Sequence, residues 1–114
     1  MNLYHVSPKS NHLAIAKTGI EAAFAKNKSH TSWFVDWSRV GWALAHVSSR
    51  HKVPVDDLEI WIVIAEQVRN VKRSRLQGVF YTRCFVRTVA VISADRALNL
   101  WESAQEPPSG GQAK

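Results

Sequence analysis

The hydrophobic and polar residues of the chain follow two periods, one typical of strands and one typical of helices. Short apolar or alternating runs rich in branched and aromatic residues predict strands. Apolar residues at spacings of three and four predict helices. Strands are expected over residues 2–7, 31–35, 58–65, 78–82 and 87–93, and helices over residues 10–17, 37–50 and 94–101.

Capping residues support the first two helices. Ser10 or Asn11 is expected as the N-cap of the first helix, and Gly19 lies just past its end. Asp36 is expected to cap the second helix, and Pro54 follows that helix as a breaker. The apolar face of the second helix is expected to consist of Val40, Ala43, Leu44 and Val47.

The order of these elements predicts an α+β fold, in which short helices flank a small mixed sheet. The third strand, residues 58–65, is apolar on both faces and is expected in a central position. Residues 1–104 are expected to form one domain, because a chain of 114 residues can build one core. Residues 21–29 are expected to form a polar loop with a helical turn. Residues 105–114 lack core-forming side chains and are expected to be a disordered tail.

The composition predicts a soluble, cytoplasmic protein without membrane contact. Apolar residues make up 46% of the chain, but no run approaches the roughly 20 residues of a membrane span. The N-terminus lacks the pattern of a signal peptide. The single cysteine, Cys84, excludes an internal disulfide and any multi-cysteine metal site, and no metal ligands are predicted.

The positive charge of the chain is concentrated in one segment. The net charge of +6 favours a polyanionic partner such as RNA, DNA or a phosphorylated cofactor. This segment is either a solvated loop or a surface that contacts phosphates, in which case binding weakens with salt. Its basic residues are Arg69, Lys72, Arg73 and Arg75.

Two groups of polar residues lie in or beside the first two strands. His5 lies in mid-strand, where β-propensity favours branched and aromatic residues. Either His5 makes a structural hydrogen bond, or it faces a ligand together with Ser7, which shares its face of the strand. His30 and Ser32 enter the second strand. They are either ordinary strand-edge residues or lie on one face near His5.

The second helix ends in a further polar group. Trp42, His46 and Arg50 share a face at a spacing of four, and His51 follows directly. In one interpretation the tryptophan packs and the cations form a solvated flank, where they suit the C-terminus of a helix. In the other, Arg50 is a phosphate clamp with planar donors.

Several motifs of known chemistry are missing from the sequence. It contains no GxGxxG, no Walker loop, no HExxH and no serine nucleophile elbow. The carboxylates are few and scattered, which argues against a hydrolase with paired carboxylates. The remaining candidates are therefore histidines, arginines and hydroxyl residues.

The order of these candidates resembles the ADP-ribosyltransferase fold, and within it the catalytic part of the RNA 2′-phosphotransferases. That family opens with a histidine strand and a short helix ending in Gly-Leu, followed by a His-x-His-x-Ser strand, Arg-His-Gly and Asn-Gly-Val-x-Leu-Thr. The resemblance covers roughly residues 3 to 93, and order and spacing carry it. The matching stretches are YHVS at 4–7, TGI at 18–20, His30 with Ser32, Arg50-His51 and QGVFYT at 77–82.

The resemblance implies a split mixed sheet with NAD as substrate in its cleft. His5 would form a hydrogen bond with the ADP-ribose portion of NAD, and Arg50 and His51 would hold phosphate. The basic loop would face RNA or another anionic acceptor. The strand at 78–82 has no counterpart of the glutamate that many ADP-ribosyltransferases carry, which favours the phosphotransferase branch. The remaining pocket residues implied by the resemblance are Ser7, His30, Ser32 and, beside nicotinamide, Tyr81.

Three hypotheses on function follow from the sequence. The first is a transferase that binds NAD or ADP-ribose and acts on a nucleic-acid or protein acceptor. The second is a non-catalytic module that binds nucleic acid or a nucleotide through the basic segment, with tryptophan or tyrosine stacking. The third is a small interaction or inhibitor domain whose exposed tryptophans contact a protein partner.

Overall fold

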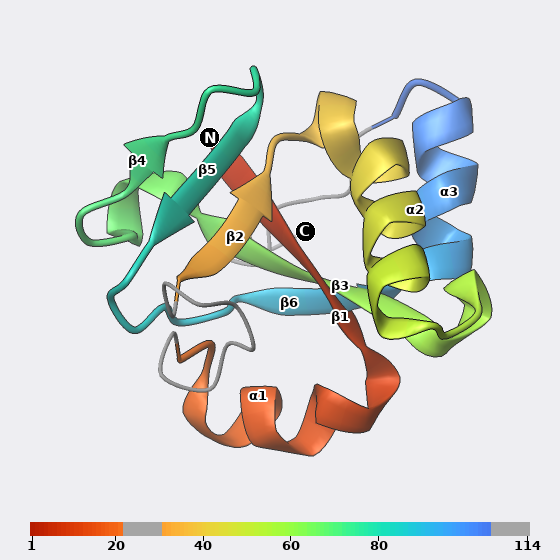
Figure 1. Ribbon diagram of the computed structural model, residues 1–114, viewed down its shortest axis with the longest axis horizontal. Helices are drawn as coiled ribbons and strands as arrows, with labels where there is room; N and C mark the ends of the chain where they lie inside the picture. The colour runs from red at the N-terminus through yellow and green to blue at the C-terminus, as the bar shows by residue number, and fades with distance from the viewer. Residues whose placement is uncertain (22–30, 106–114) are drawn as a thin grey trace.

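The computed structural model describes residues 1–21 and 31–105, in which six strands and three α-helices form an α+β domain (Figure 1). Short 3-10 turns precede the first two helices. The strands are β1 (Asn2–Pro8), β2 (Ser32–Val35), β3 (Leu58–Ile64), β4 (Lys72–Arg73), β5 (Val79–Thr82) and β6 (Ala90–Ser93), and the helices are α1 (His12–Thr18), α2 (Val40–His51) and α3 (Ala94–Glu102).

The predicted strands and helices are present, with shifted ends. Because the 3-10 turns come first, both helices begin two or three residues later in the chain than expected. Asn11 and Arg39 therefore occupy the N-cap positions of α1 and α2. Asp36 instead precedes the 3-10 turn and makes no side-chain capping bond. Gly19 follows α1 with a φ of 84°, as its predicted place past the helix end requires. The predicted loop and tail lie outside the described residues, apart from their ends at 21 and 105.

All pairs between the described strands are antiparallel, so the prediction of a mixed sheet is wrong. The strand order is β4-β5-β2-β1-β3-β6. β2 and β3 flank α2 in sequence and run in the same direction, as strands joined by a crossover helix do. β1 lies between them and pairs antiparallel with each, so the strand–helix–strand order produces no parallel pair. β3 is interior, as expected for an apolar strand, although one position from the edge.

The sheet is nearly divided between β1 and β2. β1 and β3 share seven register pairs, from Asn2–Ile64 to Pro8–Leu58, whereas β1 and β2 share only Tyr4–Val35. β1 and β2 cross at a wide angle in Figure 1. Within this one six-stranded sheet, β4-β5-β2 and β1-β3-β6 therefore form two ladders of three strands that are weakly joined.

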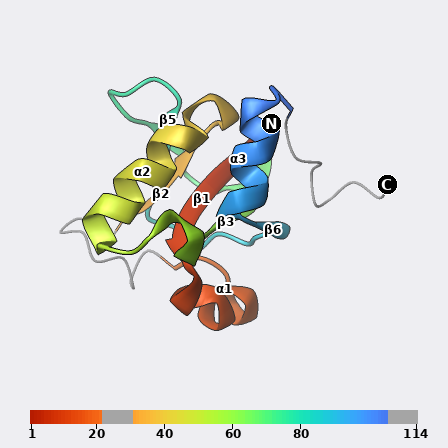
Figure 2. The same cartoon turned by 90° about the vertical axis from the view of Figure 1, so that its right-hand side faces the viewer.

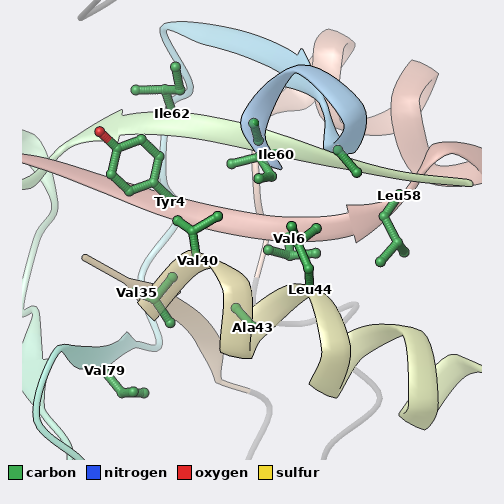
Figure 3. Packing of buried hydrophobic residues seen from close by; sticks show 12 residues of the cluster. Tyr4, Val6, Val35, Val40, Ala43, Leu44, Leu58, Ile60, Ile62 and Val79 are labelled. Atoms are coloured by element: carbon green, nitrogen blue, oxygen red, sulfur yellow. The ribbon is translucent and has the colours of Figure 1, made fainter. Parts of the chain in front are cut away.

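The helices cover both faces of the sheet. Figure 2 shows α2 and α3 on one side of β1 and β3, and α1 on the other. Alternate residues of each strand point to opposite faces, so β1 contributes Tyr4 and Val6 to one core cluster and Leu3 to the other. The first cluster lies under α2 and α3, where Leu44 packs on β1 (Figure 3). The second cluster contains Ile15 of α1.

None of the helices in residues 1–21 and 31–105 combines the length and the apolar character that crossing a bilayer needs.

Candidate functional site

The most exposed aromatic pair of the sheet lies across β2 and β5. Trp33 and Tyr81 are register partners on adjacent antiparallel strands, so their side chains emerge on the same face. Their ring centroids are 5.0 Å apart, with an angle of 41° between the ring planes. Trp33 is 43% exposed, although it lies in mid-strand between two buried residues. An exposed tryptophan at this position offers a flat apolar surface to a ligand.

Three arginines lie beside this aromatic pair. An open depression of about 410 Å³ is bounded by Arg73 from β4, Arg75 from the following loop and Arg83 from the end of β5. Arg73, Arg75 and Arg83 are exposed, and no acidic residue is among the described residues that bound the depression. The remaining residues of its wall are Thr31, Trp33, Ser74 and Tyr81. We call this set of seven residues the aromatic–arginine face.

The loop that carries Arg75 is held by backbone hydrogen bonds. The amide of Ser74 donates to the carbonyl of Val79 at 2.9 Å, and the amide of Asp36 donates to the carbonyl of Gly78 at 2.9 Å. Nε of Arg39 donates to the carbonyl of Gln77 at 2.7 Å. These bonds attach the loop to the 3-10 turn before α2, so the chain around Arg75 has a defined position.

The other two predicted basic residues do not line the depression. Lys72 is the register partner of Tyr81 on β4, so the two side chains share a face of the sheet. The carbonyl of Arg69 accepts a hydrogen bond of 2.7 Å from the buried hydroxyl of Thr82, which ties the basic segment to β5. Of the four predicted basic residues, only Arg73 and Arg75 line the depression.

His5 lies at the point where β1 and β2 diverge. Nδ1 of His5 is 2.8 Å from the carbonyl oxygen of Trp33, so Nδ1 carries the hydrogen and donates it. The imidazole also packs on Phe34, with ring centroids 5.5 Å apart. Burial lowers the pKa of His5, because desolvation penalises the charged ring more than the bond to the Trp33 carbonyl favours it. The structural hydrogen bond considered for His5 therefore has a specific acceptor, the carbonyl of Trp33. Because β1 and β2 diverge here, this carbonyl lies outside the regular β1–β2 ladder.

The predicted hydroxyl residues on this side of the sheet are buried. Ser7 accepts a hydrogen bond of 3.1 Å from Nδ2 of Asn11 and thereby links β1 to the turn before α1. Ser32 is the register partner of Thr82 and is 3% exposed. By strand alternation Ser7 and Ser32 share the faces of His5 and Phe34, opposite to the Trp33 side chain. His30 lies outside the described residues.

Arg50 and His51 lie in the last turn of α2 and are exposed. α2 packs on the face of the sheet formed by Tyr4 and Val6, whereas His5 alternates to the opposite face. The structure therefore separates Arg50 and His51 from His5 by the thickness of the sheet. Along the same helix, His46 stacks on Trp42 at 5.1 Å and 13°, as their spacing of four predicts.

Four residues of the face were not among the predicted site residues: Thr31, Trp33, Ser74 and Arg83. The signal for Trp33 was strand alternation, which places it opposite to Ser32, the residue that the motif emphasised. Arg83 follows Tyr81 by two positions and so falls on the same side. Sequence reasoning also missed a pair formed by His12 and Glu59, because 47 residues separate the two side chains.

Comparison of the chain with models of known protein families, with curated proteins and with solved structures finds no match. The ADP-ribosyltransferase-like fold therefore stays a prediction.

Proposed function

We propose that the chain binds single-stranded nucleic acid through the aromatic–arginine face. One observation carries this proposal: Trp33 and Tyr81, 5.0 Å apart, lie in the same depression as Arg73, Arg75 and Arg83. Proteins that hold single strands combine stacking on aromatic side chains with a positive groove along the backbone. The face has both components on adjacent strands of one sheet.

Stacking favours a single strand over a duplex. The bases of a duplex are already stacked on one another, so their flat faces are covered, whereas an unpaired base can lie on an exposed indole. Trp33 is 43% exposed and held against Tyr81, so its ring keeps its orientation without a ligand. A base that stacks there contributes about 1–3 kcal/mol to binding.

The three arginines supply the electrostatic component. A guanidinium binds a phosphate with two parallel hydrogen bonds, and each neutralised phosphate releases counterions. With one phosphate for each of Arg73, Arg75 and Arg83, log K falls with log salt at a slope of about −2 for a single strand. Raising the salt from 50 to 200 mM then weakens binding by roughly 15- to 20-fold.

Fluorescence anisotropy with a labelled oligouridylate or oligoadenylate, and with a duplex of the same length, tests the proposal. We expect single-strand binding with this salt slope. Trp33→Ala is expected to raise Kd by about 5- to 150-fold, the range that corresponds to the loss of one stacked base. Replacement of Arg73, Arg75 and Arg83 by glutamine is expected to flatten the slope.

Matched variants elsewhere on the surface serve as controls. Trp42 on α2 is 40% exposed, close to the exposure of Trp33, and Arg96 on α3 is an exposed arginine outside the face. Trp42→Ala and Arg96→Gln are expected to leave Kd within about twofold of wild type, since ordinary surface substitutions change free energies by less than about 0.5 kcal/mol. Binding that Trp42→Ala weakens as much as Trp33→Ala, or preference for the duplex, would refute the proposal.

The transferase predicted from the family resemblance is the second candidate. In this candidate His5, the residue that the resemblance places on ADP-ribose, would act indirectly: it donates to the carbonyl of Trp33 at 2.8 Å and so supports the strand that forms the face. NAD also contains an aromatic ring and phosphates, which the same face would attract. Calorimetry with NAD and ADP-ribose, followed by an assay of nicotinamide release, tests this candidate. Absence of binding, with His5→Ala unchanged, would contradict it.

A further inference from the structure

A histidine on the opposite side of the molecule is held by a buried carboxylate. Nδ1 of His12, the first residue of α1, lies 2.8 Å from Oε2 and 3.1 Å from Oε1 of Glu59 on β3. The side chain of Glu59 is 8% exposed, whereas that of His12 is 43% exposed. The pair therefore presents an accessible imidazole on a rigid, buried support.

The bond to Glu59 decides which ring nitrogen is available. A carboxylate has only acceptors, so Nδ1 of His12 carries the hydrogen, and Nε2 of the neutral ring keeps its lone pair. The indole of Trp61 packs against the imidazole, with ring centroids 5.2 Å apart, and is itself 4% exposed. Glu59 and Trp61 lie two residues apart on one face of β3. Both contacts of the ring thus come from an interior strand, which fixes its orientation before any reagent binds.

We propose that His12 is a phosphoryl-accepting nucleophile that takes its phosphoryl group from an N-phosphoryl donor of the phosphoramidate class. The lone pair of Nε2 attacks phosphorus and forms a new N–P bond. The P–N bond of the donor breaks, and its electron pair leaves with the nitrogen, which departs as ammonia from protonated phosphoramidate. No oxidant, reductant or metal ion enters this balance.

Glu59 favours this reaction through the charge that forms on the ring. Nδ1 of His12 keeps its hydrogen during the transfer, so the phosphorylated ring carries a positive charge. This charge develops at 2.8 Å from the Glu59 carboxylate, which is already aligned and needs no reorganisation. His46 provides the comparison within the same molecule. It is exposed on α2 and stacks on Trp42, and it has no carboxylate partner in the part of the chain that the structure describes.

A purely structural role for the pair leads to different expectations. If His12 only docks α1 and satisfies the buried Glu59, any side chain that donates a hydrogen bond from the same place serves equally well. His12→Asn keeps an N–H near the position of Nδ1 but lacks Nε2. The structural role survives this substitution, whereas the proposed reaction does not.

The experiment incubates the full chain with potassium phosphoramidate and follows each histidine by mass spectrometry of peptides, with acid lability identifying phosphohistidine. We expect His12 to react about tenfold faster than His46, a ratio equivalent to about 1.4 kcal/mol in the barrier. Glu59→Gln keeps an acceptor for Nδ1 but removes the charge, and is expected to bring the rate at His12 close to that at His46. His12→Asn is expected to remove the fast site and to keep the circular dichroism spectrum of the wild type.

Equal rates at His12 and His46 in the wild-type chain would overturn the proposal, as would an unchanged rate at His12 in a folded Glu59→Gln variant. If the Glu59 variant loses its fold, the wild-type comparison of the two histidines decides alone. Nucleic-acid binding is measured separately, so failure of this proposal is distinguishable from failure of the proposed function.

Discussion

Gly78 closes the loop between β4 and β5, and its replacement by alanine tests how firmly that loop is positioned. Its φ is +78°, a backbone conformation that side chains disfavour. A Cβ at Gly78 would lie 2.8 Å from Oδ2 of Asp36 and 2.9 Å from Cγ of Arg39. Alanine therefore meets an unfavourable backbone conformation and two side chains that must move.

The two effects give the size of the expected loss. The positive φ costs an alanine about 1–2 kcal/mol. Moving Asp36 and Arg39 disturbs the bonds that Gly78 and Gln77 accept, at 2.9 and 2.7 Å, each worth about 0.5–1.5 kcal/mol. We expect Gly78→Ala to lower the free energy of unfolding by about 2–5 kcal/mol, the sum of these contributions.

Urea unfolding with linear extrapolation measures this loss. Gly41→Ala is the matched control: Gly41 lies in α2, where alanine favours the helix by up to about 1 kcal/mol, and its nearest neighbour is the half-exposed ring of Trp101 at 3.2 Å. Gly78→Asn separates the two causes, because asparagine tolerates a positive φ but still brings a Cβ. A loss below about 1 kcal/mol for Gly78→Ala would refute the reasoning.

Three further predictions concern the core, a buried hydroxyl and a histidine. Leu44→Ala, at a side chain that is 2% exposed, is expected to lower the free energy of unfolding in urea by about 3–5 kcal/mol. Leu13→Ala, at a side chain that is 82% exposed, is expected to lower it by less than about 0.5 kcal/mol, and similar losses in the two variants would contradict the described core. Thr82→Val removes the hydroxyl that donates to the Arg69 carbonyl and is expected to cost about 1–3 kcal/mol by the same measurement, while a neutral effect would mean that this bond does not stabilise the fold. Because burial lowers the pKa of His5 below its ordinary value of 6.5, the unfolded chain binds the proton more readily than the folded chain. The free energy of unfolding is therefore expected to fall as the pH drops below 6.5, and to fall less in His5→Gln. An equal decrease in the wild type and in His5→Gln would argue against a lowered pKa of His5.

The sequence predicted the elements of the fold better than their arrangement. A short continuous apolar run located β3, and its residues Ile60, Trp61, Ile62 and Val63 are all buried. The same pattern could not reveal that β1 lies between β2 and β3, because strand order depends on contacts between distant residues. β4 was missed because Lys72 and its neighbour are exposed and carry no hydrophobic pattern.

The candidate site was predicted in part for the same reason. The basic segment is continuous in sequence, so its arginines could be found, and Tyr81 came from a motif. Trp33 became a site residue only once pairing with β5 placed it beside Tyr81. The bond between His12 and Glu59 arises because β1, α1 and β3 meet in space, a contact that no local pattern contains.

The weak junction between β1 and β2 has a consequence for how the two ladders communicate. Between the described strands β1 and β2, Tyr4–Val35 is the one register pair, and the bond from His5 to the Trp33 carbonyl supplements it. Across this joint, one hydrophobic cluster under α2 combines Val35 and Val79 of one ladder with Tyr4 of the other. α2 therefore covers the junction between the two ladders. Under the proposed function, a displacement of the β2–β5 ladder on binding is expected to reach β1 mainly through the side chains packed under this helix, and substitutions in that cluster are expected to change the coupling without altering the aromatic–arginine face.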